Sequence, residues 1–137
     1  VGLQNTVTFT DSVDTATLSK LYQSCAFVIV PSLYEGGGSG PVAEALLAGK
    51  PVVCSKIPPI EEQLHTYGLD SSSNCVTLFA PDSVDSIVQA IESAIQRLPE
   101  LETQARIAQS RLISLSPKLW EEWAAFYSEQ MRIVASE

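Results

Sequence analysis

The sequence has 137 residues, of which 45% are hydrophobic and 18% are charged, as in an ordinary globular domain that buries a core without disulfides or metals. Sixteen acidic residues against eight basic ones give a net charge of −8, which argues against a nucleic-acid-binding surface. No apolar run reaches the ~18 residues of a transmembrane helix, and no signal peptide opens the chain.

The residue pattern near the start of the chain predicts a strand, a helix and a second strand. Val7–Phe9 is a short strand candidate, and residues 11–14 form a loop and helix cap. The apolar residues that then recur at the spacing of one helix face are Leu18, Leu21, Tyr22 and Cys25. Ala26–Val30 is apolar throughout, which is typical of a parallel strand buried on both faces.

A glycine-rich loop at residues 31–40 leads into the next helix. Pro41 suits the first helical position, and Gly49 is expected to end the helix in a left-handed conformation. The elements predicted after it are a strand at Pro51–Ser55, a helix at Ile60–His65, a polar loop at Asp70–Asn74, a strand at Val76–Phe79, a helix at Val84–Ile95 capped by Asp82 or Ser83, and helices at Leu101–Ile113 and Pro117–Val134. The last helix carries a stripe of Trp120, Trp123, Tyr127 and Val134.

Alternation of strands and helices predicts an α/β fold, with a four-stranded, mostly parallel, Rossmann-like sheet flanked by helices. Four strands are few for an independent sheet of this kind, and the sequence opens with Val rather than Met. We therefore expect residues 1–137 to be a partial domain that lacks its first strands, with a C-terminal helix over residues 115–137.

The cysteines and the histidine give little support for a disulfide, a metal site or a catalytic triad. Cys25, Cys54 and Cys75 show neither a disulfide framework nor zinc-ligand spacing, and each lies in or beside an apolar run. His65 is the only histidine, which leaves little material for a Ser-His-Asp triad or a histidine-metal site. We expect buried reduced thiols in a cytoplasmic protein, no metal, and a histidine on the surface or at a helix end.

The candidate site is the glycine-rich turn between the strand that ends at Val30 and the helix that starts at Pro41. Open α/β sheets bind ligands at this position, and glycine lets the backbone approach a ligand closely. The helix start offers free N–H groups and a partial positive charge that suit a phosphate. Glycine-rich turns are common, so a turn with no ligand remains an alternative.

Two carboxylates flank this turn. Glu35 opens it, and Glu44 lies one turn into the helix, where helical side chains lean back toward the helix start. A carboxylate can accept two hydrogen bonds from a sugar or ribose diol. The alternative is that Glu35 caps the loop and Glu44 is a favourable charge near a helix start.

The run PSLYEGGGSGPVAEALLAGKPVVCS resembles the donor-domain signature of group 1 glycosyltransferases, which are retaining enzymes of the GT-B fold. The flanking runs VTFTDSVDTATLSKLYQSCAFVIVPS, PDSVDSIVQAIESAI and SPKLWEEWAAFYSEQM are similar to that family as well. Two features depart from its pattern: Glu35 and Glu44 have eight rather than seven residues between them, and the turn lacks the usual aromatic residue.

This resemblance implies the C-terminal, nucleotide-sugar-binding domain of a GT-B hexosyltransferase that needs no metal or other cofactor. Glu35 would contact the donor sugar or its diphosphate as a catalytic residue, and Glu44 would bind the ribose hydroxyls. The turn residues that would bind the sugar and distal phosphate are Gly36, Gly37, Gly38, Ser39 and Gly40. Ile57 and Pro58 are weaker candidates near the nucleotide.

Other parts of such an enzyme are missing from the sequence. The family's basic pair lies upstream, and only Lys20, Lys50 and Lys56 fall in the α/β portion here. The N-terminal acceptor domain would be a required partner, so we expect the isolated chain to be inactive. The alternative is a non-catalytic GT-B-like domain for nucleotide binding or scaffolding; a sugar-nucleotide epimerase shares the fold but matches the motif less well.

Overall fold

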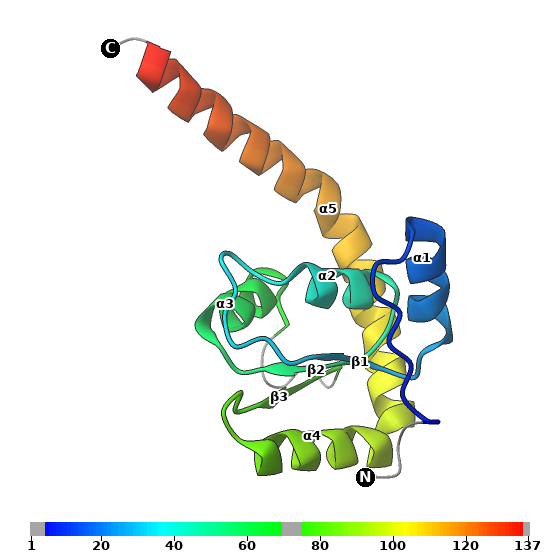
Figure 1. Cartoon of the computed structure of the whole chain (residues 1–137). Coiled ribbons are helices and arrows are strands. Elements are labelled where there is room, and N and C mark those ends of the chain that lie inside the picture. The colour runs from blue at the N-terminus through cyan, green and yellow to red at the C-terminus, as the bar shows by residue number, and fades with distance from the viewer. Residues whose placement is uncertain (1–4, 70–74, 136–137) are drawn as a thin grey trace.

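The structure, a computed structural model, describes residues 5–69 and 75–135. In chain order its elements are α1 (Thr15–Ser24), β1 (Val28–Val30), α2 (Gly40–Leu47), β2 (Val52–Ser55), α3 (Pro58–Thr66), β3 (Val76–Phe79), α4 (Val84–Gln96) and α5 (Leu98–Ala135). Helices lie on both faces of one small sheet, as Figure 1 shows. The predicted Rossmann-like α/β architecture is confirmed.

The sheet has three parallel strands in the order β1-β2-β3 within the described residues. The prediction of a fourth strand at Val7–Phe9 was wrong, because this segment pairs with no strand of the sheet. Its side chains are open to solvent, and Phe9 is 89% exposed. An extended segment becomes a stable strand only when its N–H and C=O groups join a ladder, and among residues 5–69 and 75–135 this one pairs with no other strand.

Side chains of β2 alternate between two apolar clusters. Val52 and Cys54 pack with α2, α3 and α5 on one face, and Val53 packs with α4 and Phe79 on the other. All four β2 residues are buried. The central strand is therefore covered by helices on both faces, as in other parallel sheets.

The edge strand β1 differs from its prediction. Ala26–Val30 was expected to be buried on both faces, but the strand covers only Val28–Val30 and Ile29 is 41% exposed. The reason is that α4 packs against β2 and β3, which leaves the Ile29 side of β1 uncovered in the described part of the chain.

Local signals at the helix ends are confirmed. Asp14 caps α1 by accepting a hydrogen bond from the Thr17 amide at 2.7 Å, which holds the pKa of Asp14 below its usual range. Pro41 lies in the first turn of α2, and Gly49 follows that helix with φ +70°. Of the two candidate caps for α4, Ser83 is the one that accepts a bond from the helix, at the Ser86 amide.

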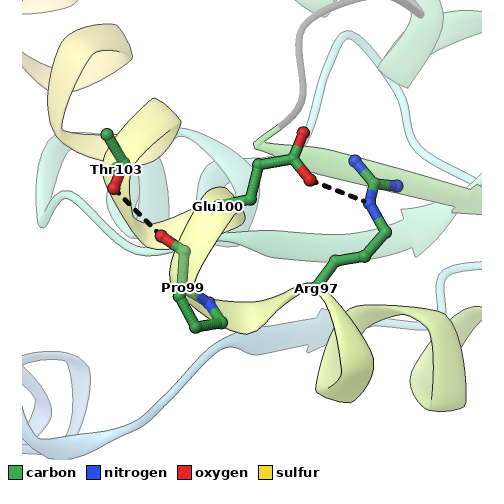
Figure 2. A network of polar contacts seen from close by, with 4 residues as sticks. All are labelled: Arg97, Pro99, Glu100 and Thr103. Carbon is green, nitrogen blue, oxygen red and sulfur yellow. Dashed lines mark hydrogen bonds and ion pairs between the residues drawn. The ribbon is translucent and has the colours of Figure 1, made fainter.

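The junction between α4 and α5 is a single residue, Arg97 (Figure 2). Its Nε lies 3.4 Å from Glu100 Oε2, and the Thr103 hydroxyl donates to the Pro99 carbonyl at 2.9 Å. Because both charged side chains are largely exposed, the ion pair contributes little stability. The start of this helix also differs from the prediction, because α5 begins at Leu98, three residues before the expected Leu101.

The two C-terminal helices predicted at Leu101–Ile113 and Pro117–Val134 form one continuous helix. α5 has 38 residues and runs through Pro117, whose missing N–H removes one helical hydrogen bond without ending the helix. The second half of α5 projects away from the sheet (Figure 1). The side chains of the predicted tryptophan-containing stripe are not among those that the structure describes. The predicted loop at residues 70–74 lies outside the described residues.

His65 and two of the three cysteines lie as predicted, whereas Cys25 was expected to be buried and is only partly buried, because it is the residue that ends α1. Cys25, Cys54 and Cys75 are free, and the last two are fully buried. Burial raises the pKa of the Cys54 thiol to about 12 and that of Cys75 to about 11. His65 is exposed in the last turn of α3.

Candidate functional site

The glycine turn lies at the carboxyl edge of the parallel sheet. β1 ends at Val30, and the chain then loops past the start of α3 before it enters α2 at Gly40 (Figure 1). Lys56, which follows β2, lies at the same edge because the strands are parallel. The connection therefore places the turn where open α/β sheets bind their ligands.

Backbone donors of the turn have few protein partners. In the described part of the chain, no hydrogen bond forms to the amides of Gly36, Gly37, Gly38 or Gly40. Gly38 has φ +96°, a conformation that favours glycine, and a side chain at Gly36, Gly37 or Gly40 would meet nothing within 4 Å. Together with the N-terminus of α2, these N–H groups can bind an anionic oxygen.

Ser39 differs from its neighbours because its backbone already has partners. Its N–H donates to Gln63 Oε1 at 2.8 Å, and its carbonyl accepts from Gln63 Nε2 at 3.0 Å. The Ser39 hydroxyl is buried, makes no cap bond to α2, and has no hydrogen-bond partner among the described residues. Of the amides expected to meet a ligand, this one is occupied by protein.

Glu35 is half-buried at the start of the turn. The Ser32 hydroxyl donates to Glu35 Oε1 at 2.7 Å, so a residue of the same loop orients the carboxylate. An ionised carboxylate has about four acceptor positions, so this bond leaves acceptor capacity for a ligand hydroxyl.

Glu44 is exposed on the second turn of α2 and bonds across to α1. The Tyr22 hydroxyl donates to Glu44 Oε2 at 2.8 Å. Burial, followed by this hydrogen bond and the charge of Glu44, raises the pKa of Tyr22 to about 12. The carboxylate is thus held on the α1 side of α2, and no hydrogen bond joins it to Glu35 or to the turn within residues 5–69 and 75–135.

Two weaker candidates lie where α3 begins. Ile57 is the residue before the helix and is 7% exposed, with its side chain in the main apolar cluster. Pro58 is the first residue of α3. The side chain of Ile57 therefore serves the core, and only the backbone at this position is suited to a ligand contact.

Positive charge near the turn is sparse. Lys50 Nζ donates to the Cys25 carbonyl at 2.9 Å, and both residues precede their strands, so this contact lies at the opposite edge of the sheet. Lys56 is exposed at the carboxyl edge. Among the described residues, no group of three His, Cys, Asp or Glu side chains is placed to hold a metal ion, and no helix is both long and apolar enough to cross a membrane.

Sequence reasoning missed the two polar residues that contact the candidate site. Tyr22 was assigned only to the apolar face of α1, where its hydroxyl had no visible function. Gln63 lies 24 residues from Ser39, and no local pattern indicates such a pairing. Both contacts depend on how elements that are distant in the sequence pack together, and local periodicity does not define this packing.

Residues 1–111 match the sequence model of the family described as glycosyl transferases group 1. This match contains the whole glycine turn and both flanking carboxylates. The chain belongs to the group 1 glycosyltransferase family.

Two relatives agree with this assignment. The O-antigen chain mannosyltransferase B of Escherichia coli is 33% identical over 98 residues, which is 71% of this chain and 24% of that protein. An uncharacterized glycosyltransferase of Methanocaldococcus jannaschii is 40% identical over 62 residues, or 45% of this chain and 16% of that protein. The chain therefore spans only a small part of the length of the group 1 relatives that it matches.

The fold also matches a solved structure. Sucrose-phosphate synthase from Thermosynechococcus elongatus superposes with a TM-score of 0.68 at 21% identity, over 93% of this chain and 32% of that one. At this identity the likeness concerns the fold alone, and it agrees with the GT-B architecture expected from the group 1 motif.

Proposed function

We propose that this chain is the donor-binding part of a glycosyltransferase that transfers a sugar from a nucleotide sugar to an acceptor. The observation that carries the proposal is the set of unpaired backbone amides at Gly36–Gly38 and Gly40, at the N-terminus of α2 and the carboxyl edge of the sheet. Such donors suit the oxygens of a diphosphate. Membership of the group 1 family supports the same assignment.

In this proposal the donor spans the turn. Its distal phosphate and sugar contact the amides of Gly36–Gly38 and Gly40, and Glu35 acts as the catalytic-site carboxylate that contacts the sugar. Glu44 accepts hydrogen bonds from the ribose hydroxyls, because an ionised carboxylate keeps acceptor positions beyond the one that Tyr22 uses. The bond between the anomeric carbon and the phosphate oxygen breaks, a bond to the acceptor hydroxyl oxygen forms, the acceptor hydroxyl loses its proton, and the nucleoside diphosphate leaves. We propose that the transferred group is hexosyl and that the anomeric configuration is retained.

A departing nucleoside diphosphate needs positive charge, and the turn itself contains none. Lys56 is the basic side chain that β2 delivers to this edge. We propose that further cations and the acceptor-binding groups come from a separate N-terminal domain, so that this chain alone gives little turnover. No metal or other cofactor is required by this scheme.

The thiols bear on the cellular location. Cys54 and Cys75 are buried and unpaired, as expected of a protein that folds under reducing conditions. We propose a cytoplasmic location on this basis.

NMR titration with UDP, GDP and ADP and their glucose and mannose conjugates tests the donor site directly. We expect the amide signals of Gly36–Gly40 to move with at least one of these ligands, while those of α4, on the opposite face, stay in place. Perturbation confined to α4, or binding of none of the ligands, would favour the alternative of a scaffold domain without donor recognition.

A further inference from the structure

Gln63 of α3 is joined to the glycine turn by its side-chain amide. Oε1 accepts from the Ser39 N–H at 2.8 Å, while Nε2 donates both to the Ser39 carbonyl at 3.0 Å and to the Tyr67 hydroxyl at 3.1 Å. The two bonds to Ser39 mimic the pairing of one strand residue with its neighbour. The oxygen and both amide hydrogens of Gln63 are thereby engaged.

The glycines of the turn have few protein neighbours, although Ser39 between them is buried. A Cβ built on Gly36, Gly37 or Gly40 would have no atom within 4 Å, whereas one on Gly38 would have Gln63 Cδ at 3.3 Å as its nearest neighbour. The bond between Ser32 and Glu35 lies within the loop and does not tie it to another element. Among the described residues, Gln63 is therefore the side chain that hydrogen-bonds the turn to α3, while the Ser39 carbonyl also accepts from the Ala43 N–H of α2 at 3.2 Å.

We propose that Gln63 is a positioning residue for the donor turn, an inference that rests on the proposed function. A run of glycines samples many backbone conformations, so a turn ordered before binding loses less entropy when the ligand arrives. Gln63 supplies this order by fixing both backbone groups of Ser39. The bond also removes the Ser39 amide from the set of available donors, which assigns the phosphate contacts to Gly36–Gly38 and Gly40.

Gln63 also explains how a turn with one additional residue keeps a definite shape. Eight residues lie between Glu35 and Glu44, one more than in the group 1 pattern that the motif resembles. A longer glycine-rich loop without a side-chain anchor loses more conformational entropy when it is ordered. Gln63 hydrogen-bonds the loop at Ser39, the residue that immediately precedes α2. The helix start and the turn are thus anchored at one position.

Two variants separate hydrogen bonding from packing. Gln63→Met fills similar space against Gly38 but forms none of the three hydrogen bonds, and Tyr67→Phe removes only the bond to Tyr67. Hydrogen exchange at the Ser39 amide reports the anchor, and titration with UDP, GDP and ADP reports the donor site. The thermal midpoint shows whether either variant is merely less stable.

With Gln63→Met we expect exchange at Ser39 to accelerate at least tenfold and affinity for the tightest-binding nucleotide to fall about tenfold, as for the loss of two ordinary hydrogen bonds. With Tyr67→Phe we expect affinity within about threefold of the unsubstituted protein, because the pairing with Ser39 remains. Unchanged affinity in a folded Gln63→Met protein would overturn the proposal, as would unchanged exchange at Ser39. If the unsubstituted protein bound none of the nucleotides, the proposed function would fail, whereas exchange would still decide whether Gln63 anchors the turn.

Discussion

The hydroxyl of Tyr22 donates a hydrogen bond to Glu44 Oε2 at 2.8 Å, which links α1 to the carboxylate that we assign to the donor ribose. The helix position of Glu44 follows from Pro41 and the end of α2, but its side-chain direction follows from Tyr22. A carboxylate held in one orientation loses less freedom when it binds a diol. We therefore expect the contact between α1 and α2 to affect ligand binding as well as packing.

Removing this hydroxyl tests the effect. We expect Tyr22→Phe to weaken nucleotide binding by about threefold and to lower the free energy of unfolding by no more than about 1 kcal/mol, because the hydrogen bond is exposed and the ring of Tyr22 is retained. Calorimetric titration and urea unfolding measure the two quantities. Thr103→Val is the control, since it removes another exposed hydroxyl that donates a hydrogen bond, on α5 and outside the turn, and it should leave nucleotide binding unchanged. A Tyr22→Phe protein that binds as tightly as its parent would show that Glu44 needs no such support.

The conformation of Gly38 predicts a cost for any side chain there. Its φ of +96° disfavours L-residues, and an added Cβ would press on Gln63. We expect Gly38→Ala to lower the free energy of unfolding by about 1–2 kcal/mol. Gly37→Ala, where an added Cβ meets open space, should cost less than about 0.5 kcal/mol. Equal costs in urea unfolding would contradict the geometry of the turn.

Buried thiols predict a loss of stability at alkaline pH. The pKa of Cys54 is raised to about 12 and that of Cys75 to about 11, so both stay protonated in the folded state at pH values where unfolded thiols ionise. The unfolded state then binds fewer protons, and stability falls as pH rises above about 9, by about 1.4 kcal/mol per pH unit for each thiol. This loss continues until the folded pKa is reached, and it is absent below pH 8.

Urea unfolding between pH 7.5 and 10.5 measures this slope. A Cys54→Ala, Cys75→Ala protein provides the comparison, because tyrosines and lysines titrate in both proteins and cancel in the difference. The difference in unfolding free energy between the two proteins should shrink or reverse sign as pH rises. A constant difference across this range would mean that the thiols are not shielded from solvent.

Sequence patterns predicted those parts of the fold that depend on neighbouring residues. The apolar run at β2, the helical spacing in α4, and the caps at Asp14 and Ser83 each act within a few residues, and the structure confirms them. The strand expected at Val7–Phe9 failed because strand formation requires a distant partner. Pro117 was expected to separate two helices, although one missing N–H does not stop a long helix.

The candidate site divides in the same way. Its location was predictable, because a glycine turn between a strand and a helix lies at a known edge of an α/β sheet. Its partners were not, since Gln63 and Tyr22 reach the site from α3 and α1 across long intervals of sequence. The assigned roles of Glu35, Gly36–Gly40 and Glu44 remain predictions that binding measurements must test.

The most direct of these measurements compares nucleotide affinity in Glu44→Ala and Glu92→Ala proteins. Both changes remove one exposed carboxylate, but Glu92 lies on α4, on the opposite face of the sheet. If Glu44 binds the ribose hydroxyls, calorimetric titration with UDP, GDP and ADP will show about a tenfold or greater loss for Glu44→Ala and no change for Glu92→Ala. Equal affinities in the two variants would contradict the assignment of Glu44 to the donor site.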